Sequence, residues 1–151
     1  DEGKPDQKVV GTLARVRLMQ GDYRNAARLY ELGLEKRWTG KTWTPQVSQW
    51  MKGLAAAYVK LGTDEKLRSV LETVARYEED NLPVRIKLAR MALDRGDSES
   101  AKKWAREACF IDIMEVDVHR ILQQVYEDAG EVQKSAREKR VIADIEAIES
   151  R

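Results

Sequence analysis

The side chains best suited to chemistry lie close together between residues 109 and 119. The 151 residues include one cysteine, Cys109, and one histidine, His119. Between them lie three carboxylates, on Asp112, Glu115 and Asp117. Carboxylates and an imidazole are ligands that divalent cations accept, so the stretch Asp112–His119 is the best local candidate for a metal site. A single imidazole cannot supply the paired histidines of a zinc-protease motif.

Structural roles explain the same residues at least as well. The carboxylates come at the start of a helix expected from residue 115, where negative charge complements the helix dipole. Cys109 stands between Ala108 and Phe110 at the apolar end of another predicted helix, which favours a buried thiol over a nucleophile. The glycines occur singly and form no phosphate-binding loop. We therefore predict no catalytic residue, no metal and no cofactor, and do not expect an enzyme.

Composition indicates a helical chain with a hydrophobic core. Hydrophobic residues make up 42% and charged residues 35% of the sequence, and 151 residues can bury a core. One cysteine excludes an internal disulfide, and the sequence has no apolar run of about 18 residues, so no membrane insertion is expected. Residues 1–6 begin without Met and are expected to form a disordered tail, and the chain is expected to be a region of a larger protein. The compartment stays open.

The charge is unevenly distributed along the chain. Residues 1–62 carry 11 Lys and Arg against 6 Asp and Glu, a net charge of +5, whereas residues 63–151 carry 16 against 20, a net charge of −4. Such asymmetry can steer a charged partner towards one end of a protein. It is weaker than the basic footprint of nucleic-acid-binding proteins, so no nucleic-acid partner is expected.

Four glycines mark an internal repeat. Gly21, Gly62, Gly96 and Gly130 are separated by 41, 34 and 34 residues. Eight residues before them stand four leucines: Leu13, Leu54, Leu88 and Leu122. The next position is small in three of the four cases, with Ala14, Ala55, Ala89 and then Gln123. A small residue there suits the close packing of two helices, so the period predicts stacked helical hairpins.

These residues resemble the tetratricopeptide repeat family, whose pattern places Leu, a small residue, an aromatic residue and a turn glycine in this order. Tyr58 and Tyr126 occupy the first aromatic position, but Arg17 and Ala92 depart from it. The resemblance covers residues 7–149. It implies an all-α, right-handed superhelical solenoid of antiparallel helix pairs in a single domain, residues 7–151. The four repeats would span about 7–40, 46–80, 82–114 and 115–149, the second and fourth with degraded second helices.

Local signals predict where eight helices begin and end. Gly-Asp or Gly-Thr at three of the turns places a flexible residue beside an N-cap. The expected caps are Asp22, Thr63 and Asp97, together with Thr44 before Pro45 and Asn81 near Pro83. The expected helices are 7–20, 23–36, 46–61, 64–79, 83–95, 98–111, 115–129 and 131–149.

The resemblance also implies a binding surface, because in tetratricopeptide proteins the first helix of each pair lines a concave face. Carried onto this chain, that face would include the predicted partner-binding residues Arg15, Met19, Lys52, Lys60, Arg90, Asp94, Arg120 and Gln124, beside Ala56, Ile86 and Glu127. Its charge changes from basic to acidic along the chain, which would suit a peptide with an acidic and a basic end, positioned by Arg15, Lys52 and Arg90. A merely solvated charged face is the alternative. The residues that grip the carboxylate of chaperone tails in one subclass are absent.

Aromatic and apolar residues suggest two further contacts. An insertion over residues 37–45 contains Trp38 and Trp43, and Trp50 follows it closely. Packing is the preferred interpretation for Trp38 and Trp50, whereas Trp43 could equally be an aromatic anchor for a partner. The predicted last helix carries Val141, Ile142, Ile145 and Ile148 with no repeat after it. This apolar end could join two copies as a homodimer.

Together these features favour a protein-protein interaction module that binds a peptide or protein segment. Repeats run through the chain, and no catalytic constellation accompanies them. Two alternatives stay open from the sequence: a non-catalytic helical accessory domain of a larger bacterial enzyme such as a peptidase, and a self-assembling scaffold.

Overall fold

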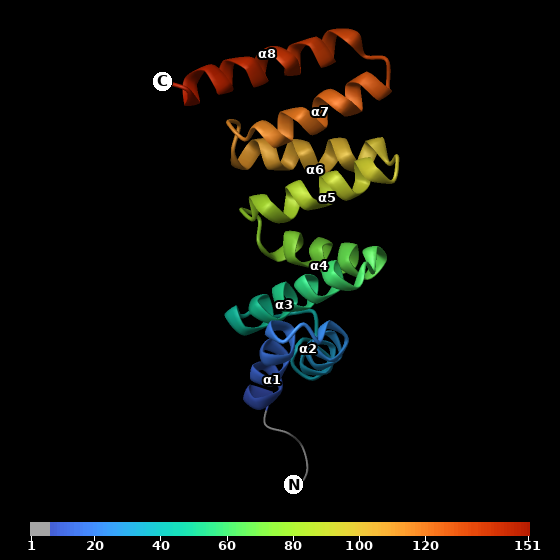
Figure 1. Ribbon diagram of the computed structural model, residues 1–151, viewed down its shortest axis with the longest axis vertical. Helices are drawn as coiled ribbons and strands as arrows, with labels where there is room; N and C mark the ends of the chain where they lie inside the picture. Colours follow the sequence, from blue (N-terminus) through green and yellow to red (C-terminus); the bar gives the residue numbers. More distant parts are fainter. Residues whose placement is uncertain (1–6) are drawn as a thin grey trace, which may run out of the picture. The chain divides into compact units, whose positions relative to one another are not determined.

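The computed structural model describes the backbone from residue 7 to residue 151 and the side chains from Val9 onward. The expected tail over residues 1–6 lies outside this part. All regular structure in the described residues is helical (Figure 1). The helices are α1 (Gln7–Met19), α2 (Tyr23–Arg37), α3 (Pro45–Leu61), α4 (Asp64–Tyr77), α5 (Leu82–Asp94), α6 (Ser98–Ile111), α7 (Val116–Asp128) and α8 (Val132–Glu149). The predicted bounds differ from these by at most two residues.

The chain divides into two compact units, Asp1–Tyr77 and Glu78–Arg151. In the first unit, α1 packs against α2, α2 against α3 and α3 against α4, and α1 also contacts α3. The second unit repeats these relations, since α5 packs on α6, α6 on α7 and α7 on α8, and α5 also contacts α7. Each unit therefore contains two helical hairpins whose first helices are neighbours.

The four turn glycines adopt one geometry. Gly21, Gly62, Gly96 and Gly130 have φ angles of 78, 66, 75 and 70°, in the left-handed region that favours glycine. The residue after each glycine donates its backbone N–H to the carbonyl oxygen four residues before that glycine. These N···O distances are 2.9 Å for Asp22 to Arg17, 3.2 Å for Thr63 to Tyr58, 2.9 Å for Asp97 to Ala92 and 2.8 Å for Glu131 to Tyr126. This is the bond that closes a helix through a left-handed glycine.

Four of the five expected N-caps form. The side chains of Asp22, Thr44, Asn81 and Asp97 accept hydrogen bonds from Asn25, Val47, Val84 and Ser100 backbone N–H groups. The prediction for Thr63 was wrong, because its Oγ1 is buried and has no hydrogen-bond partner within the described residues. Burial removed this hydroxyl from the position that a cap requires, although the backbone of Thr63 still accepts from Leu67.

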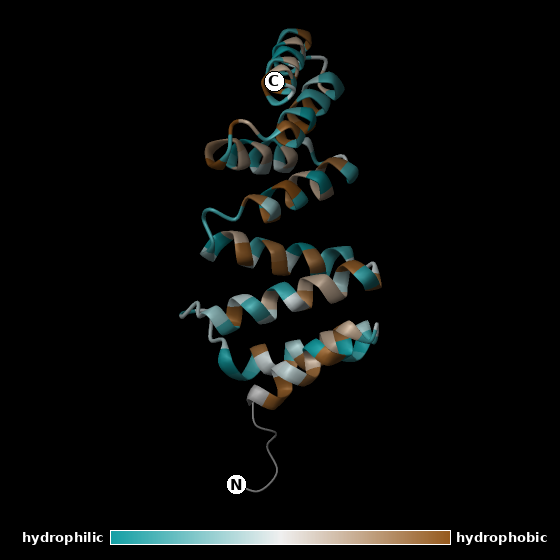
Figure 2. Cartoon of the chain, turned by 60° about the vertical axis from the view of Figure 1, so that its left-hand side comes forward, coloured by the Kyte–Doolittle hydropathy of each residue, from teal (hydrophilic) through white to brown (hydrophobic). Residues whose placement is uncertain are grey.

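The cores of the two units are built differently. In the second unit, the small residues Ala101, Ala105 and Ala108 of α6 meet the aliphatic side chains of α7. In the first unit, glycines face aromatic rings, and Trp50 is only 2% exposed. Brown and teal residues alternate around the helices in Figure 2, as expected for amphipathic helices. None of the helices in the described part is long and apolar enough to cross a membrane.

Candidate functional site

A cavity of the first unit lies between α1, α2 and α3 and has a volume of about 620 Å³. It is lined by Gly11, Thr12, Arg15, Leu18, Tyr30, Gln46, Gln49, Trp50, Lys52, Gly53 and Ala56. The first helices α1 and α3 supply most of these residues. They contact each other, and both contact α2. The structure thus brings two predicted binding residues, Arg15 and Lys52, into one cavity.

Glycines let two aromatic rings form part of the lining. A Cβ atom added to Gly11 would lie 2.4 Å from Nε1 of Trp50, and one added to Gly53 would lie 2.4 Å from Cζ of Tyr30. Any larger residue at either glycine would displace a ring. Trp50 therefore has the packing role expected for it, and its ring is held between helices rather than presented to solvent.

The electrostatic character of the cavity is basic. Arg15 and Lys52 are its charged lining residues, and no carboxylate belongs to the described lining. Burial raises the pKa of the Tyr30 hydroxyl, and the positive charge of Arg15 opposes that rise. The positive charge of Arg15 therefore acts on Tyr30, whose ring forms part of the cavity lining. Amide and hydroxyl groups from Gln46, Gln49 and Thr12 add hydrogen-bonding capacity, so the cavity suits an anionic group.

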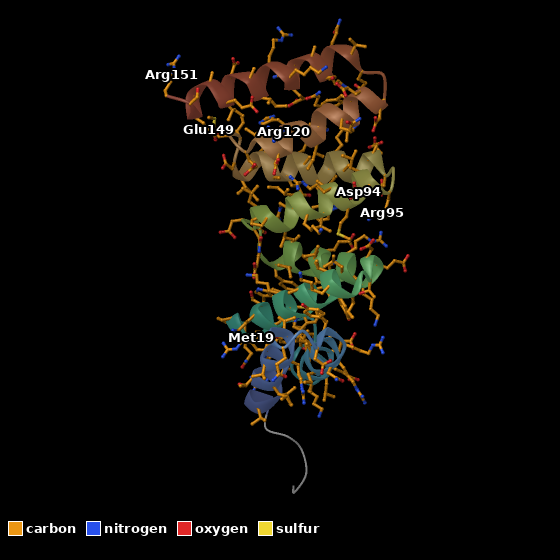
Figure 3. The ribbon with its side chains drawn as sticks, in the orientation of Figure 1. Met19, Asp94, Arg95, Arg120, Glu149 and Arg151 are labelled. Carbon is orange, nitrogen blue, oxygen red and sulfur yellow. The ribbon has the colours of Figure 1, made fainter. Side chains whose placement is uncertain are left out.

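Two other predicted residues of the first unit lie outside this cavity. Met19 is 81% exposed and is labelled at the end of α1 in Figure 3. Lys60 is exposed near the end of α3, two turns beyond Lys52. Their partner-binding roles stay predictions, separate from the cavity.

In the second unit, predicted binding residues are engaged in ion pairs. Arg90 of α5 donates to Asp117 of α7. Arg120 lies 3.6 Å from the other oxygen of Asp117 and 2.9 Å from Glu146 of α8. The pairs join the exposed surfaces of three helices. A ligand that uses Arg90 or Arg120 must compete with these carboxylates.

An acidic depression surrounds that ion-pair chain. It has a volume of about 390 Å³ and is lined by Asp112, Met114, Glu115, Val116, Asp117, Arg120, Glu146 and Glu149. Figure 3 shows Arg120, near the N-terminal end of α7, on the same side as Glu149, at the C-terminal end of α8. Five carboxylates against one arginine give it the opposite charge to the cavity of the first unit.

The remaining two predicted residues are not part of this depression. Asp94 lies at the turn between α5 and α6, away from Arg120 (Figure 3). Gln124 donates from Nε2 to Asp128, 2.8 Å away on the same helix. The structure therefore distributes the predicted residues of this unit over separate places.

Trp43 belongs to a three-ring cluster with Trp38 and Tyr77. The Trp43 and Tyr77 rings are stacked, with centroids 4.9 Å apart and planes 1° apart. Trp38 meets each of them edge to face, at 6.3 and 6.0 Å. The Tyr77 hydroxyl also donates to the carbonyl oxygen of Gly40, 2.6 Å away. The inserted segment is thus fastened to the end of α4, and an anchor role for Trp43 would involve a ring that already packs.

The residues between 109 and 119 have structural partners. His119 is buried, with Nδ1 2.8 Å from Glu138 and Nε2 2.7 Å from the carbonyl oxygen of Ile113. Glu115 caps α7 by accepting from the Asp117 backbone N–H, 3.1 Å away. Burial, followed by the charge of Glu138, raises the pKa of the Cys109 thiol to about 11. Each of these groups thus stabilises the second unit.

The apolar residues of α8 mostly pack within their own unit. Ile145 is 3% exposed and Val141 and Ile142 are half-buried, whereas Ile148 is 58% exposed. Among the four residues considered for a dimer contact, only Ile148 presents a large apolar area. The homodimer stays a prediction.

Sequence reasoning missed Tyr30, Gln46 and Gln49 as cavity residues. The family pattern considers inward positions of first helices near the turn glycine, whereas Tyr30 is on a second helix and both glutamines are near the start of α3. The glycines at positions 11 and 53 were an available signal. A glycine within a helix costs stability unless another group needs the space.

Comparison with known proteins places the fold. No protein-family model and no curated protein matches the sequence. Among solved structures, MamA of AMB-1 gives a TM-score of 0.79 at 20% identity, covering 94% of this chain and 74% of that one. MamA of MSR-1 gives 0.75 at 19%, covering 99% and 82%. MamA from Desulfovibrio magneticus RS-1 gives 0.72 at 17%, covering 95% and 77%. At such identities the likeness shows the fold alone, which is an all-α tetratricopeptide-like solenoid.

Proposed function

We propose that this chain is a protein-interaction module whose first unit binds an acidic peptide segment of a partner in the cavity between α1, α2 and α3. One observation carries the proposal: a cavity of about 620 Å³ is lined by Arg15 and Lys52 without a carboxylate. Two cations on neighbouring helices attract carboxylates and suppress the binding of basic segments.

The size and floor of the cavity fit a few residues of peptide. The rings of Trp50 and Tyr30 fill the space beside Gly11 and Gly53, so a ligand would meet aromatic rings there. Thr12, Gln46 and Gln49 supply groups that can meet a peptide backbone.

We further propose that the four hairpins are four tetratricopeptide repeats. Their support is the shared turn geometry and the equivalent leucines, because Leu54, Leu88 and Leu122 are 4%, 2% and 5% exposed. Arg90, Asp94, Arg120 and Gln124 remain proposed partner-binding residues of the second unit. The accessory-domain and scaffold alternatives apply if the cavity binds no peptide.

The test uses random heptapeptides displayed on phage and selected on the immobilised full chain. We expect enriched sequences to contain Asp or Glu, and synthetic copies to bind at least about tenfold more weakly to the Arg15→Glu/Lys52→Glu variant. Lys36→Glu is the matched control, because it reverses an exposed lysine of the same unit that does not line the cavity, and it should leave the affinity unchanged.

Selected peptides without acidic residues would contradict the proposal. Undiminished binding to the folded double variant would also exclude the cavity as the site. Circular dichroism of each variant establishes that the helices are intact.

A further inference from the structure

The outer side of α1 carries apolar residues that no described helix covers. Val9, Leu13 and Val16 are 55%, 39% and 39% exposed. With Thr12 they line an apolar depression of about 370 Å³, and we name these four residues the α1 outer face. Brown segments are visible on α1 in Figure 2. Leu13 is the exception among the four repeat leucines, since the other three are buried.

In each unit, the second hairpin has the equivalent face of its first helix covered. Counted back from the turn glycine, the α1 outer face occupies positions 12, 9, 8 and 5. The same positions on α3 hold Trp50, Gly53, Leu54 and Ala57, and those on α7 hold Val118, Ile121, Leu122 and Val125. On α3, residues of α2 contact Trp50 and Gly53 of this set. On α7, the whole set belongs to a buried cluster that also includes alanines of α6. The α1 outer face is therefore a helix-packing face whose helix is missing from the described residues.

The chemistry of the face specifies the missing helix. The α7 face is aliphatic, as is most of the α1 face. The α7 face shares its buried cluster with Ala101, Ala105 and Ala108 of α6, all 0% exposed. Small residues at this spacing bring one helix close to the aliphatic side chains of another. The occupant of the α1 outer face should present the same small-residue stripe.

Charge specifies the flanks of that helix. The α1 helix contains Arg15 and Arg17 and no acidic residue. Residues 7–30 contain five basic side chains and one acidic side chain, Asp22. Carboxylates beside the small-residue stripe would be attracted, whereas basic flanks would be repelled.

A second copy of the chain fits poorly by this argument. Two α1 helices would bring like charges together. Stacking α8 of a second copy on α1 fails for another reason, because the positions of Ala101 and Ala105 in α6 correspond to Ser135 and Lys139 in α8. Lys139 is paired with Glu127 at 3.2 Å, and it would be pressed onto Leu13.

We infer that the α1 outer face docks an amphipathic helix of a protein partner, with alanine or glycine in its contact stripe and carboxylates on its flanks. This surface is separate from the proposed cavity site, although Thr12 lines both. The mode is that of a helix laid in an apolar groove. It goes beyond the acidic-peptide function and does not depend on it.

The probe is a fluorescein-labelled peptide of residues 97–112 of this chain, which includes α6. A lactam between Glu99 and Lys103, both exposed and four residues apart, holds it helical, and Cys109→Ala prevents oxidation. An acidic version carries Lys102→Glu and Arg106→Glu beside the alanine stripe, and a second version keeps the basic residues. Circular dichroism shows that both versions are helical, and fluorescence anisotropy measures binding to the full chain.

We expect the peptide with the added carboxylates to bind saturably, and the version that keeps Lys102 and Arg106 to bind at least about tenfold more weakly. Leu13→Gln should weaken the acidic peptide by a similar factor. Ile148→Gln, at a comparably exposed apolar residue of α8, should have no effect. Lys52→Glu should also leave this affinity unchanged, which separates the inference from the cavity proposal.

Three outcomes would overturn the inference. The first is no binding of the acidic peptide. The second is that both peptides bind with equal affinity, or that the acidic peptide binds the Leu13→Gln variant as tightly as the unchanged chain. The third is a doubled solution mass that Leu13→Gln abolishes, since a second copy would then cover the face.

Discussion

The ring of Trp50 fills the space that a side chain on Gly33 would need: a Cβ atom on Gly33 would lie 2.7 Å from Cζ3 of that ring. Gly33 is on α2 and Trp50 on α3, so this contact sets how closely the two hairpins of the first unit approach. The same ring also meets Gly11 of α1.

Gly33→Ala should therefore destabilise the chain. Alanine normally improves a helix interior, but here the added methyl group must displace a buried ring, which costs about 1–3 kcal/mol. Urea unfolding monitored by circular dichroism measures the free energy. Trp50→Leu in the same chain should relieve part of the cost of the alanine, and an unchanged or higher stability for Gly33→Ala alone would show that the ring does not restrict α2.

The two threonines at helix starts should respond differently to valine. Thr44 Oγ1 accepts from the Val47 backbone N–H at 3.2 Å, so Thr44→Val should lower the free energy of unfolding by about 1 kcal/mol. Thr63 Oγ1 is buried without a described partner, so Thr63→Val should leave stability unchanged or raise it by up to about 1 kcal/mol. Equal losses for both variants in urea unfolding would indicate that Thr63 does cap α4.

The stacked pair of Trp43 and Tyr77 should couple energetically. A double-mutant cycle with Trp43→Ala and Tyr77→Ala should give an interaction energy of about 0.5–1.5 kcal/mol for the rings, with the bond from Tyr77 to Gly40 contributing as well. Tyr77→Phe separates the hydroxyl from the ring. If Trp43→Ala instead leaves unfolding unchanged and weakens a peptide ligand, the anchor interpretation gains and the packing one fails.

Cys109 should be slow to alkylate in the folded protein. Its pKa is raised from 9.0 to about 11, and only the thiolate reacts. At any pH between 7 and 8, the thiolate fraction of Cys109 should therefore be about 100-fold smaller than that of a thiol with a pKa of 9.0. Labelling with iodoacetamide, followed by mass spectrometry, should be correspondingly slower than labelling in urea. Because the pKa of Cys109 is raised, the labelling rate of the folded protein should keep rising above pH 9, where the thiol of the unfolded chain is already largely ionised. Equal native and unfolded rates would contradict the burial of the thiol.

Much of the helical architecture could be predicted because its signals are local. The turn glycines, the caps at Asp22, Thr44, Asn81 and Asp97 and the leucine spacing act within a few residues, so their positions in the sequence determine where helices begin and end. The family resemblance implied that Arg15 and Lys52 lie on one surface, whereas the cavity that they share came only from the structure.

Tertiary contacts decided the rest, and each depends on residues distant in sequence. The glycines at 11, 33 and 53 indicate in the sequence that another group needs the space, but not that this group is the ring of Trp50 or Tyr30. Thr63 had the expected residue type for a cap, but burial left its hydroxyl unpartnered. Arg90 and Arg120 are basic in any reading of the sequence, yet only the packing of α5, α7 and α8 brings Asp117 and Glu146 to them. Leu13 follows the same pattern as Leu54, and its exposure depends on whether a helix packs on it, which spacing along the chain does not encode.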